Sequence, residues 1–352
     1  MKADHTLPTD HYTLTVTGIR EERPDFKTFI LEPDMPLEYK AGQYLTLVHT
    51  EKDEDIRRSY SFTSSPALNE PLSVGVRRID NGFFSRRLVD DVQVGDTLYA
   101  AGAAGLFVLP ENMQDYRQVF LLAAGSGITP ELSLLKTILY TLPDVAVTLI
   151  YSNSNPQKAI YKEELEQLAA AFPDRFKLHF LFSNSPDLAQ ARLYKDLLQQ
   201  LVRQYAVAPL HQVLFYTCGP LGYMRMCYWA LTQQGVPHEN IRRENFDTTK
   251  VAIKQMPPDT DPHEVLLHYK DQAYQLTVEY PDTILRAARK AGLNLPFSCE
   301  AGKCGNCTAR CTEGKVWMSY NEVLTERDLQ QGLVLTCVGY PVGGPAQLEL
   351  KS

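Results

Sequence analysis

Residues 297–307 read FSCEAGKCGNC and place Cys299, Cys304 and Cys307 in a C-x4-C-x2-C array. A fourth cysteine, Cys337, follows thirty positions after the array. A short loop that supplies three thiolates, with a distant residue supplying the fourth, is the ligand pattern of a plant-type [2Fe-2S] cluster. Alanine and glycine between the ligands let backbone N–H groups approach the cluster sulfurs, which tunes the reduction potential. The spacing therefore predicts that these four cysteines are metal ligands.

Two alternative uses of four cysteines are a structural zinc site and a disulfide framework. Zinc sites usually pair two C-x2-C knuckles, and disulfide frameworks suit small secreted chains. The first residues, MKADHTLPTDHYTLTV, lack the continuous apolar core of an export signal. Seven cysteines without such a signal indicate a reducing compartment, and we expect a cytoplasmic protein. Cys227 and Cys311 are predicted to be packing residues.

Length and charge limit the class of protein. A chain of 352 residues is too long for one ordinary core and suits two or three domains. A formal net charge of -7 argues against nucleic acid or an anionic membrane as the main partner, because a basic surface serves both better. No run of about eighteen apolar residues is present, so we expect no membrane insertion. A one-electron centre needs a source of single electrons, which the rest of the chain should supply.

Residues 1–112 are predicted to form a β domain. Short runs rich in β-branched and aromatic residues alternate with Gly, Pro, Asn and Asp. The one helical pattern is SRRLVDDV at 85–92. Six strands with so little helix predict a closed antiparallel barrel. The six runs are YTLTVTGIREE, FKTFILEP, GQYLTLVHT, RRSYSFTSSP, PLSVGVRRI and DTLYAAGAAG.

The character of the sequence changes at residues 113–247, where strands alternate with helical patterns, as in VFLLAA followed by PELSLLKTIL. This alternation is typical of a parallel sheet with helices on its faces. The polar, proline-containing residues 248–262 are predicted to be a linker. Residues 263–352 are predicted to be a compact third domain with a strand pair, EVLLHYK and YQLTVEY. Its helix, in TILRAARKAG, should have Asp282 as N-cap and Gly292 as its stop.

The stretch RRSYSFTSS contains Arg58, Tyr60 and Ser61 as R-x-Y-S. A flavin needs a flat aromatic ring against its isoalloxazine, a hydroxyl near its redox-active nitrogen and a cation for its pyrophosphate. Tyr60, Ser61 and Arg58 fit these roles in that order, and alternation along a strand places Arg58 and Tyr60 on one face. The alternative is an exposed strand that happens to carry an Arg and a Tyr.

Downstream, GVRRIDNGFFS adds candidate residues for the same ligand. Residues 82–85, from Gly82 to Ser85, open a predicted helix whose exposed N–H groups and hydroxyl suit a pyrophosphate. Arg77 adds charge, and Val76 is placed to contact the ring or the adenosine half. Asn81-Gly82 is also a strong hairpin signal, and both interpretations are compatible.

The stretch LLAAGSGITPE predicts a nucleotide loop. Gly125, Gly127 and Pro130 follow an apolar strand and open a helix, with Pro130 near N1. This G-x-G-x-x-P is a variant of the dinucleotide fingerprint, which brings a pyrophosphate to a helix N-terminus. A lone glycine-rich turn is weak support, but the required strand, turn and helix are all predicted here.

The stretch YTCGPLGYM ends the last strong parallel strand at Cys218, Gly219 and Pro220. Open α/β sheets bind ligands at this carboxyl edge. A small polarizable thiol at Cys218 would lie against a nicotinamide without blocking hydride transfer. The alternative is an ordinary buried strand-end cysteine.

With these patterns in this order, the chain resembles the ferredoxin-NADP reductase superfamily with a C-terminal plant-type ferredoxin domain, over nearly its whole length. Within that superfamily it resembles the reductase components of multicomponent oxygenases. The resemblance implies FAD in the barrel, NADH or NADPH on the α/β domain, and the cluster in a β-grasp domain. It implies FAD contacts from Arg58, Tyr60, Ser61, Val76, Arg77, Gly82 and Ser85, and nucleotide contacts from Gly125, Gly127, Thr129, Pro130, Cys218, Gly219 and Pro220. It also matches Phe246 to an aromatic segment that returns toward the flavin, the alternative being a buried core phenylalanine.

The function expected from the sequence is an NAD(P)H-dependent oxidoreductase. Hydride passes to FAD, held by Tyr60 and Ser61 with the nicotinamide near Cys218, and single electrons then pass through the cluster to an acceptor protein, such as an oxygenase component. Ser154 and Asn184 stand where NADPH-using relatives often have Arg, which favours NADH, although Lys158 or Lys162 leaves NADPH open.

Three alternative functions remain at this point. The first is the same reductase serving a desaturase or a separate ferredoxin. The second is a redox sensor with low turnover, and the third is a ferredoxin-like carrier fused to a degenerate α/β domain, against which the intact R-x-Y-S and G-x-G-x-x-P patterns argue. The final acceptor, its substrate, the oligomeric state and the arrangement of the domains are not encoded in local motifs.

Overall fold

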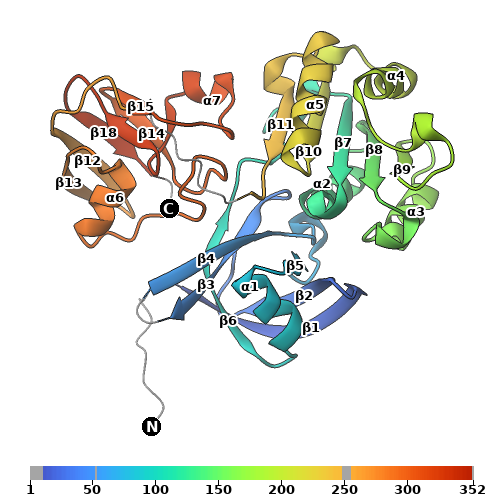
Figure 1. Ribbon diagram of the computed structural model, residues 1–352, viewed down its shortest axis with the longest axis horizontal. Helices are drawn as coiled ribbons and strands as arrows, with labels where there is room; N and C mark the ends of the chain where they lie inside the picture. The colour runs from blue at the N-terminus through green and yellow to red at the C-terminus, as the bar shows by residue number, and fades with distance from the viewer. Residues whose placement is uncertain (1–10, 52–53, 248–254, 351–352) are drawn as a thin grey trace. The chain divides into compact units, whose positions relative to one another are not determined.

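The computed structural model describes residues 11–51, 54–247 and 255–350 and divides into two compact units, Met1–Arg243 and Glu244–Ser352 (Figure 1). Part of the predicted linker, residues 248–254, lies outside the described residues. The first unit contains two sheets, so the predicted boundary at residue 112 falls within it and stays a prediction. No helix of the described ranges has the length and apolar character needed to cross a bilayer.

The first sheet of the N-terminal unit is the expected antiparallel barrel. Its strand order is β4-β3-β6-β1-β2-β5, and a bridge between Phe62 and Val74 joins the two edge strands. Closure removes the exposed edges and leaves one apolar interior, which holds Leu14, Leu45 and Phe62. The strands are β1 Tyr12–Arg23, β2 Phe26–Pro33, β3 Tyr44–Glu51, β4 Glu54–Ser61, β5 Ser73–Arg77 and β6 Thr97–Ala104.

A short helical segment connects β5 to β6. It begins two residues earlier than the sequence pattern predicts, as α1 (Phe83–Arg86), and continues as a π-helical turn, η2 (Arg87–Asp91). Phe84, Leu88 and Val89 are buried against the barrel interior. Single 3-10 turns, η1 (Pro66–Leu68) and η3 (Met113–Asp115), precede β5 and the second sheet.

The second sheet of this unit is parallel, with strand order β11-β10-β7-β8-β9. Alternate residues of β7 pack on opposite faces: Leu121 belongs to the core formed with α2 and α3, and Phe120 to the core formed with α4 and α5. Burial on both faces explains the continuous apolar runs of these strands. The elements are β7 Gln118–Ala124, η4 Gly125–Gly127, α2 Ile128–Thr141, β8 Ala146–Asn153, η5 Pro156–Lys158, α3 Lys162–Ala171, β9 Phe176–Phe182, η6 Leu188–Gln190, α4 Lys195–Tyr205, η7 Leu210–Gln212, β10 Val213–Cys218, α5 Leu221–Gln233, η8 His238–Asn240 and β11 Ile241–Glu244.

The C-terminal unit is the expected β-grasp domain, a mixed sheet of order β13-β12-β18-β14-β16 with one main helix. The expected strand pair, β12 and β13, is antiparallel, and β12 pairs with β18 in parallel. Helix α6 buries Ile284, Leu285 and Ala288. The elements are β12 His263–Tyr269, β13 Gln272–Val278, α6 Ile284–Lys290, β14 Thr308–Glu313, β15 Val316–Met318, α7 Glu326–Gln330, β16 Leu333–Leu335, β17 Gly339–Pro341 and β18 Ala346–Glu349, with β15 and β17 forming a separate pair.

Two details of the expected helix ends are corrected. Thr283, not Asp282, is the N-cap of α6, because its side chain accepts the N–H of Arg286 while Asp282 pairs with Lys290. The predicted stop at Gly292 is confirmed, with φ of 80° and its N–H bonded to the Arg289 carbonyl. Pro130 is the third residue of α2 rather than the first, a position whose N–H also has no partner within the helix.

Candidate functional site

The predicted nucleotide loop lies at the carboxyl edge of the parallel sheet. Because β7 and β10 are neighbouring parallel strands, their ends bring residues 125–130 beside residues 218–220. The two backbones are closely packed, because a Cβ added to Gly127 would lie 2.0 Å from the carbonyl oxygen of Cys218. Gly125 has φ of 57°, a left-handed conformation that favours glycine. Two motifs ninety residues apart thus lie side by side, and their contact with a nucleotide stays a prediction.

A buried tyrosine that the sequence analysis did not single out supports this loop. The Tyr151 hydroxyl donates to the Gly125 carbonyl at 2.9 Å and accepts the N–H of Ile160 at 3.2 Å. Burial raises the pKa of Tyr151, so the hydroxyl stays a donor. Thr129 closes the same turn by donating to the Ser126 carbonyl at 3.0 Å. The only signal in the sequence is a tyrosine near the end of an apolar strand.

Cys218 is fully buried at the end of β10, within the core that also contains Tyr216 and Ile128. The backbone at Gly219 is equally close-packed, since a Cβ there would lie 2.8 Å from the Cβ of Ala124. Pro220 is the N-cap of α5. This burial agrees with the alternative of a core cysteine, and contact between the Cys218 thiol and a nicotinamide stays a prediction.

The predicted flavin strand, β4, alternates as expected. Arg57 is buried, whereas Arg58 is exposed and Tyr60 is half-buried. Burial raises the pKa of Tyr60 and the nearby charge of Arg58 lowers it, which is consistent with the two side chains sharing a face. The Tyr60 ring lies 6.2 Å from that of Phe84, and Ser61 is buried.

The hydroxyl of Ser85 has partners within its own turn. It accepts the N–H of Ile79 at 3.1 Å and donates to the carbonyl of Gly82 at 3.2 Å. The Asn81-Gly82 pair leads into α1, so it does not form a tight hairpin between adjacent strands. Hydroxyl donation from Ser85 to a pyrophosphate would require these bonds to rearrange, and its role with FAD stays a prediction.

Arg77 lies close to the nucleotide loop as well as to the predicted flavin turn. Its guanidinium is 3.6 Å from Asp25, and one of its nitrogens is 3.8 Å from the Cβ position of Gly125. The side chain is half exposed and so is accessible to a ligand phosphate. Val76, in contrast, is fully buried in the barrel core, and its contact with a ligand stays a prediction.

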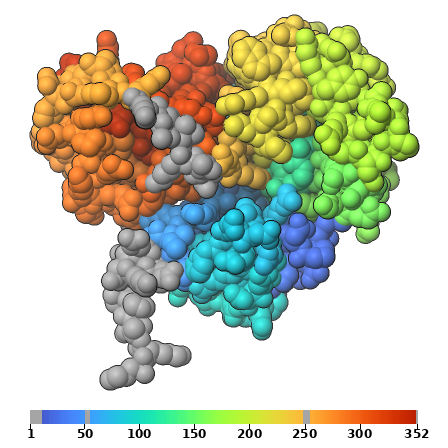
Figure 2. Space-filling view, in the orientation of Figure 1, coloured from blue at the N-terminus to red at the C-terminus, as the bar shows by residue number. Residues whose placement is uncertain are grey.

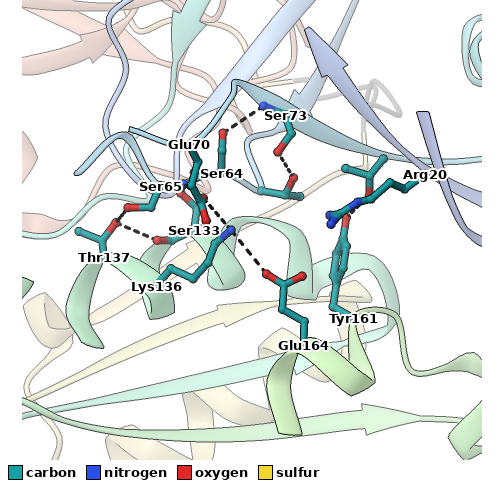
Figure 3. A network of polar contacts seen from close by, with 12 residues as sticks. Arg20, Ser64, Ser65, Glu70, Ser73, Ser133, Lys136, Thr137, Tyr161 and Glu164 are labelled. Atoms are coloured by element: carbon teal, nitrogen blue, oxygen red, sulfur yellow. Dashed lines mark hydrogen bonds and ion pairs between the residues drawn. The ribbon is translucent and has the colours of Figure 1, made fainter. Parts of the chain in front are cut away.

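A polar seam joins the barrel to α2 and α3 (Figure 3). Ser133 on α2 donates to the Ser64 carbonyl at 2.6 Å, and the hydroxyls of Ser65 and Thr137 are 2.7 Å apart. Lys136 is buried and pairs with Glu70 of the barrel at 2.8 Å and with Glu164 of α3 at 3.6 Å. In the space-filling view the barrel surface is continuous with that of the α/β region (Figure 2).

The seam has a direct consequence for the two candidate sites. Ser64 and Ser65 follow the flavin strand within four residues of Ser61, and Ser133 and Thr137 lie on the helix that the nucleotide loop opens. A second contact joins Thr28 of the barrel to the Tyr161 hydroxyl at 2.8 Å. These bonds therefore fix the flavin strand relative to the nucleotide helix, and sequence reasoning did not identify them.

Phe246 follows β11 and is 43% exposed. The alternative of a buried core phenylalanine is therefore wrong. The prediction that Phe246 approaches the flavin is not decided by its exposure and stays a prediction.

In the C-terminal unit the four predicted ligands lie together. The thiols of Cys299 and Cys304 are hydrogen-bonded to each other, as are those of Cys307 and Cys337. The Cys304 thiol and the N–H groups of residues 301, 303 and 304 lower the pKa of Cys299 to about 6. The pKa of Cys304 is raised because it keeps the proton shared with Cys299 and is buried. Hydrogen bonds aimed at the Cys299 sulfur therefore favour its thiolate form.

The arrangement of the four thiols fits the proposed cluster. The thiols form two pairs, which suits a cluster whose two irons each take two cysteines. Glycines between the ligands have the expected freedom, with φ of 71° at Gly302 and 77° at Gly305. These residues fit a [2Fe-2S] cluster.

The two cysteines predicted to pack differ in their surroundings. Cys227 is fully buried in the core shared by α4 and α5, where burial raises its pKa to about 12. Cys311 is half-buried on β14 and donates to the Glu313 carbonyl at 3.3 Å. Neither contributes a thiol to the two pairs described above.

Three family models match the chain in succession. Residues 14–109 match the oxidoreductase FAD-binding domain, residues 121–228 the oxidoreductase NAD-binding domain, and residues 267–342 the 2Fe-2S iron-sulfur cluster binding domain. The cofactors expected from the sequence, FAD, a nicotinamide nucleotide and a [2Fe-2S] cluster, are confirmed by these matches.

Two curated relatives match the chain over most of its length. The chain is 31% identical over 343 residues to a component of 1,2-phenylacetyl-CoA epoxidase from Escherichia coli K12, covering 95% of this chain and 96% of that protein. It is 35% identical over 322 residues to the ferredoxin reductase component of 3-ketosteroid-9-alpha-monooxygenase from Mycobacterium tuberculosis, covering 88% and 86%.

A solved structure supports the fold. Phthalate dioxygenase reductase matches with a TM-score of 0.59 and 22% identity, covering 96% of this chain and 98% of that one. The two curated relatives confirm the expected resemblance to oxygenase reductase components, over 95% and 88% of this chain. The chain belongs to the family of NAD(P)H-dependent oxidoreductases in which FAD-binding and NAD-binding domains are joined to a [2Fe-2S] domain, the family of oxygenase reductase components.

Proposed function

We propose that this chain uses NADH and delivers electrons, one at a time, to the terminal component of a multicomponent oxygenase. The observation that carries the proposal is the seam in one unit that fixes a flavin strand beside a nucleotide loop, in a chain that also holds two thiol pairs. We assign residues 1–112 to FAD, 113–247 to the nucleotide and 263–352 to the cluster, with 248–262 as linker. The cytoplasm fits best, since none of the seven cysteines, all within the described ranges, forms a disulfide.

The bound FAD would supply the conversion of a hydride into two single electrons, which a [2Fe-2S] cluster cannot perform. The chain's own residues bind and orient. Tyr60 and Ser61 are assigned to the flavin ring, Arg58 to its pyrophosphate, and Arg77 to the phosphates near Gly125. Hydride transfer itself needs no general acid or base, and the one proton left when the two electrons depart would pass to solvent, which agrees with the absence of a catalytic acid and base pair among the predicted site residues.

The preference for NADH rests on the carboxyl ends of β8 and β9. Two backbone bonds hold these ends side by side: the N–H of Ser183 donates to the Asn153 carbonyl at 2.9 Å, and that of Asn184 to the Ser154 carbonyl at 3.1 Å. The side chains there are neutral, whereas a 2′-phosphate favours arginine. Lys162, on the following helix, is already paired with Glu166 at 2.5 Å.

The coenzyme is tested by measuring kcat/KM for ferricyanide reduction with NADH and with NADPH, in the wild type and in Ser154→Arg. We expect NADH to be preferred by the wild type and Ser154→Arg to raise kcat/KM for NADPH. Equal or better use of NADPH by the wild type would contradict the proposal.

The acceptor is tested separately. With the reduced protein in a stopped-flow instrument, a purified oxygenase component should oxidise the cluster faster than a purified desaturase or a free [2Fe-2S] ferredoxin. The reverse order would favour the alternative of a desaturase or ferredoxin reductase. Steady-state reduction of cytochrome c distinguishes either kind of reductase from a redox sensor, because a sensor would turn over slowly.

A further inference from the structure

A buried lysine lies inside the cluster loop. Lys303, between Gly302 and the ligand Cys304, is only 3% exposed, and its ammonium donates to the carboxylate of Asp247 at 3.1 Å. Burial of an ammonium is costly unless the charge is paired and hydrogen-bonded. Asp247 therefore keeps the Lys303 charge within the loop, although its own side chain is 44% exposed.

A second contact links the same segment to the loop. Asn245, two residues before Asp247, donates to the Glu322 carboxylate at 2.9 Å, and the Tyr320 hydroxyl donates to the other oxygen of Glu322. The N–H of Glu322 in turn donates to the Gly302 carbonyl at 3.0 Å. Residues 245–247, which we call the exit segment because they follow β11, thus hold the cluster loop at two points.

The backbone of Lys303 contacts a cluster ligand directly. Its N–H donates to the sulfur of Cys299, beside a similar bond from Ala301 at 3.4 Å. Lys303 therefore makes both contacts: its side chain is bound by Asp247, and its backbone N–H is bonded to the sulfur of Cys299. A fixed positive charge and N–H donors close to a cluster stabilise the form with more negative charge, which is the reduced form.

We propose that Lys303 and Asp247 are positioning residues that set the reduction potential of the cluster, with Lys303 raising it and Asp247 holding Lys303 in place while offsetting part of its charge. Each one-electron reduction adds one negative charge to the cluster, and the electron comes from the nicotinamide through the flavin. The inference rests on the cluster assignment in the proposed function but not on the identity of the acceptor.

Lys303→Met and Asp247→Asn should shift the reduction potential of the cluster in opposite directions. Loss of packing alone would not give shifts of opposite sign. Lys303→Met keeps the buried stem and removes the charge, so it should lower the ratio of reduced to oxidised cluster at the wild-type midpoint about tenfold, or about 59 mV for one electron. Asp247→Asn keeps a hydrogen-bond acceptor and removes the negative charge, so the ratio should rise about threefold. Lys303→Arg, which restores the charge, should return the ratio toward the wild-type value.

The measurement is a redox titration of the full-length holoprotein, followed by low-temperature EPR, with iron content and spin count determined for each variant. The matched control is the pair that the exposed Lys290 forms with Asp282 in the same unit, where Lys290→Met and Asp282→Asn should leave the midpoint unchanged. Shifts of the same sign in Lys303→Met and Asp247→Asn, or none in either, would overturn the proposal. If Lys303→Met loses its cluster, the midpoints of Asp247→Asn and Lys303→Arg still test the proposal. A wild type without a reduced-cluster signal would instead refute the cluster assignment.

Discussion

Both the nucleotide loop, residues 125–130, and the cluster loop, residues 297–307, depend on glycine, but they are held in different ways. The nucleotide loop runs from the end of β7 into the first turn of α2 and packs against the backbone at the end of β10. The cluster loop has no regular secondary structure and is held by thiol pairs, N–H groups aimed at sulfur, and contacts with residues 245–247 and 320–322. The sheet shapes the first loop before any ligand binds, whereas the second depends on side chains and its cluster.

This difference predicts that damage to each loop stays within its own redox step. Substitutions at the sheet edge should slow flavin reduction and leave the cluster intact. Substitutions in the cluster loop should interrupt electron delivery and leave hydride transfer intact.

Gly127→Ala should have the largest effect. The new Cβ would lie 2.0 Å from the backbone oxygen of Cys218, which cannot rotate away. A displacement of about 1 Å at a reacting centre costs on the order of 100-fold in rate, so stopped-flow flavin reduction by NADH should slow by about that factor. Gly222→Ala is the matched control, because its Cβ meets nothing within 4 Å and should leave the rate unchanged. Loss of the cluster EPR signal in Gly127→Ala would break the comparison.

Gly302→Ala is the reciprocal test. Gly302 has φ of 71°, and a Cβ there would lie 2.9 Å from the carbonyl oxygen of Tyr320. We expect cluster content to fall several-fold while NADH reduces the flavin at the wild-type rate. Gly343→Ala is the control, since its φ is 73° but the space around it is open. It should cost about 1–2 kcal/mol of local strain and keep the cluster. Slowed flavin reduction in Gly302→Ala would mean that the two steps are not separable.

Lys136→Met tests the seam and should have an effect of intermediate size. Removing the ammonium leaves Glu70 and Glu164 without their shared partner in a partly buried position, which should cost about 1–3 kcal/mol of stability. Because the seam fixes the flavin strand relative to α2, flavin reduction should slow about tenfold, and Lys136→Arg should restore most of it. Lys162→Met, which removes a surface pair with Glu166, is the control. An unchanged rate in Lys136→Met would mean that the seam stabilises the unit without positioning the two sites.

Asp259→Asn should have the smallest effect, confined to the C-terminal unit. The N–H groups of Gly343 and Asp261, together with the His263 ring, lower the pKa of Asp259 to about 2. Because the folded pKa is below the unfolded value, the carboxylate stabilises the fold above about pH 4, and this stability is lost as pH falls toward 2. Urea denaturation should therefore show Asp259→Asn less stable than wild type at pH 7, with the gap narrowing below pH 4. A gap that is constant with pH would exclude the charge as its cause.

The sequence predicted those parts of the molecule that depend on local spacing. The four cysteines, the strand Arg58–Tyr60, the glycine loop and the strand-end Cys218 are recognisable because neighbouring residues carry the pattern. The contact between Gly127 and Cys218 could also be predicted, because neighbouring parallel strands end at the same edge of the sheet.

The contacts that the sequence did not predict join residues far apart in the chain. Glu70 and Lys136 meet only because the barrel packs on α2, and Asp247 and Lys303 are separated by more than fifty positions. A lysine between two cysteine ligands looks like a surface charge until its burial is known. The capping error at Asp282 is different in kind: two adjacent residues are both good N-caps, and only the backbone shows that Thr283 serves.

The most direct test of electron transfer through this chain is an anaerobic titration of the purified protein with NADH, followed by visible absorbance and low-temperature EPR, with Cys304→Ser alongside. In the wild type we predict bleaching of the flavin and a reduced [2Fe-2S] signal. In Cys304→Ser the flavin should still bleach and the cluster signal should be lost. A wild type whose flavin bleaches while its EPR spectrum stays silent would contradict transfer from flavin to cluster.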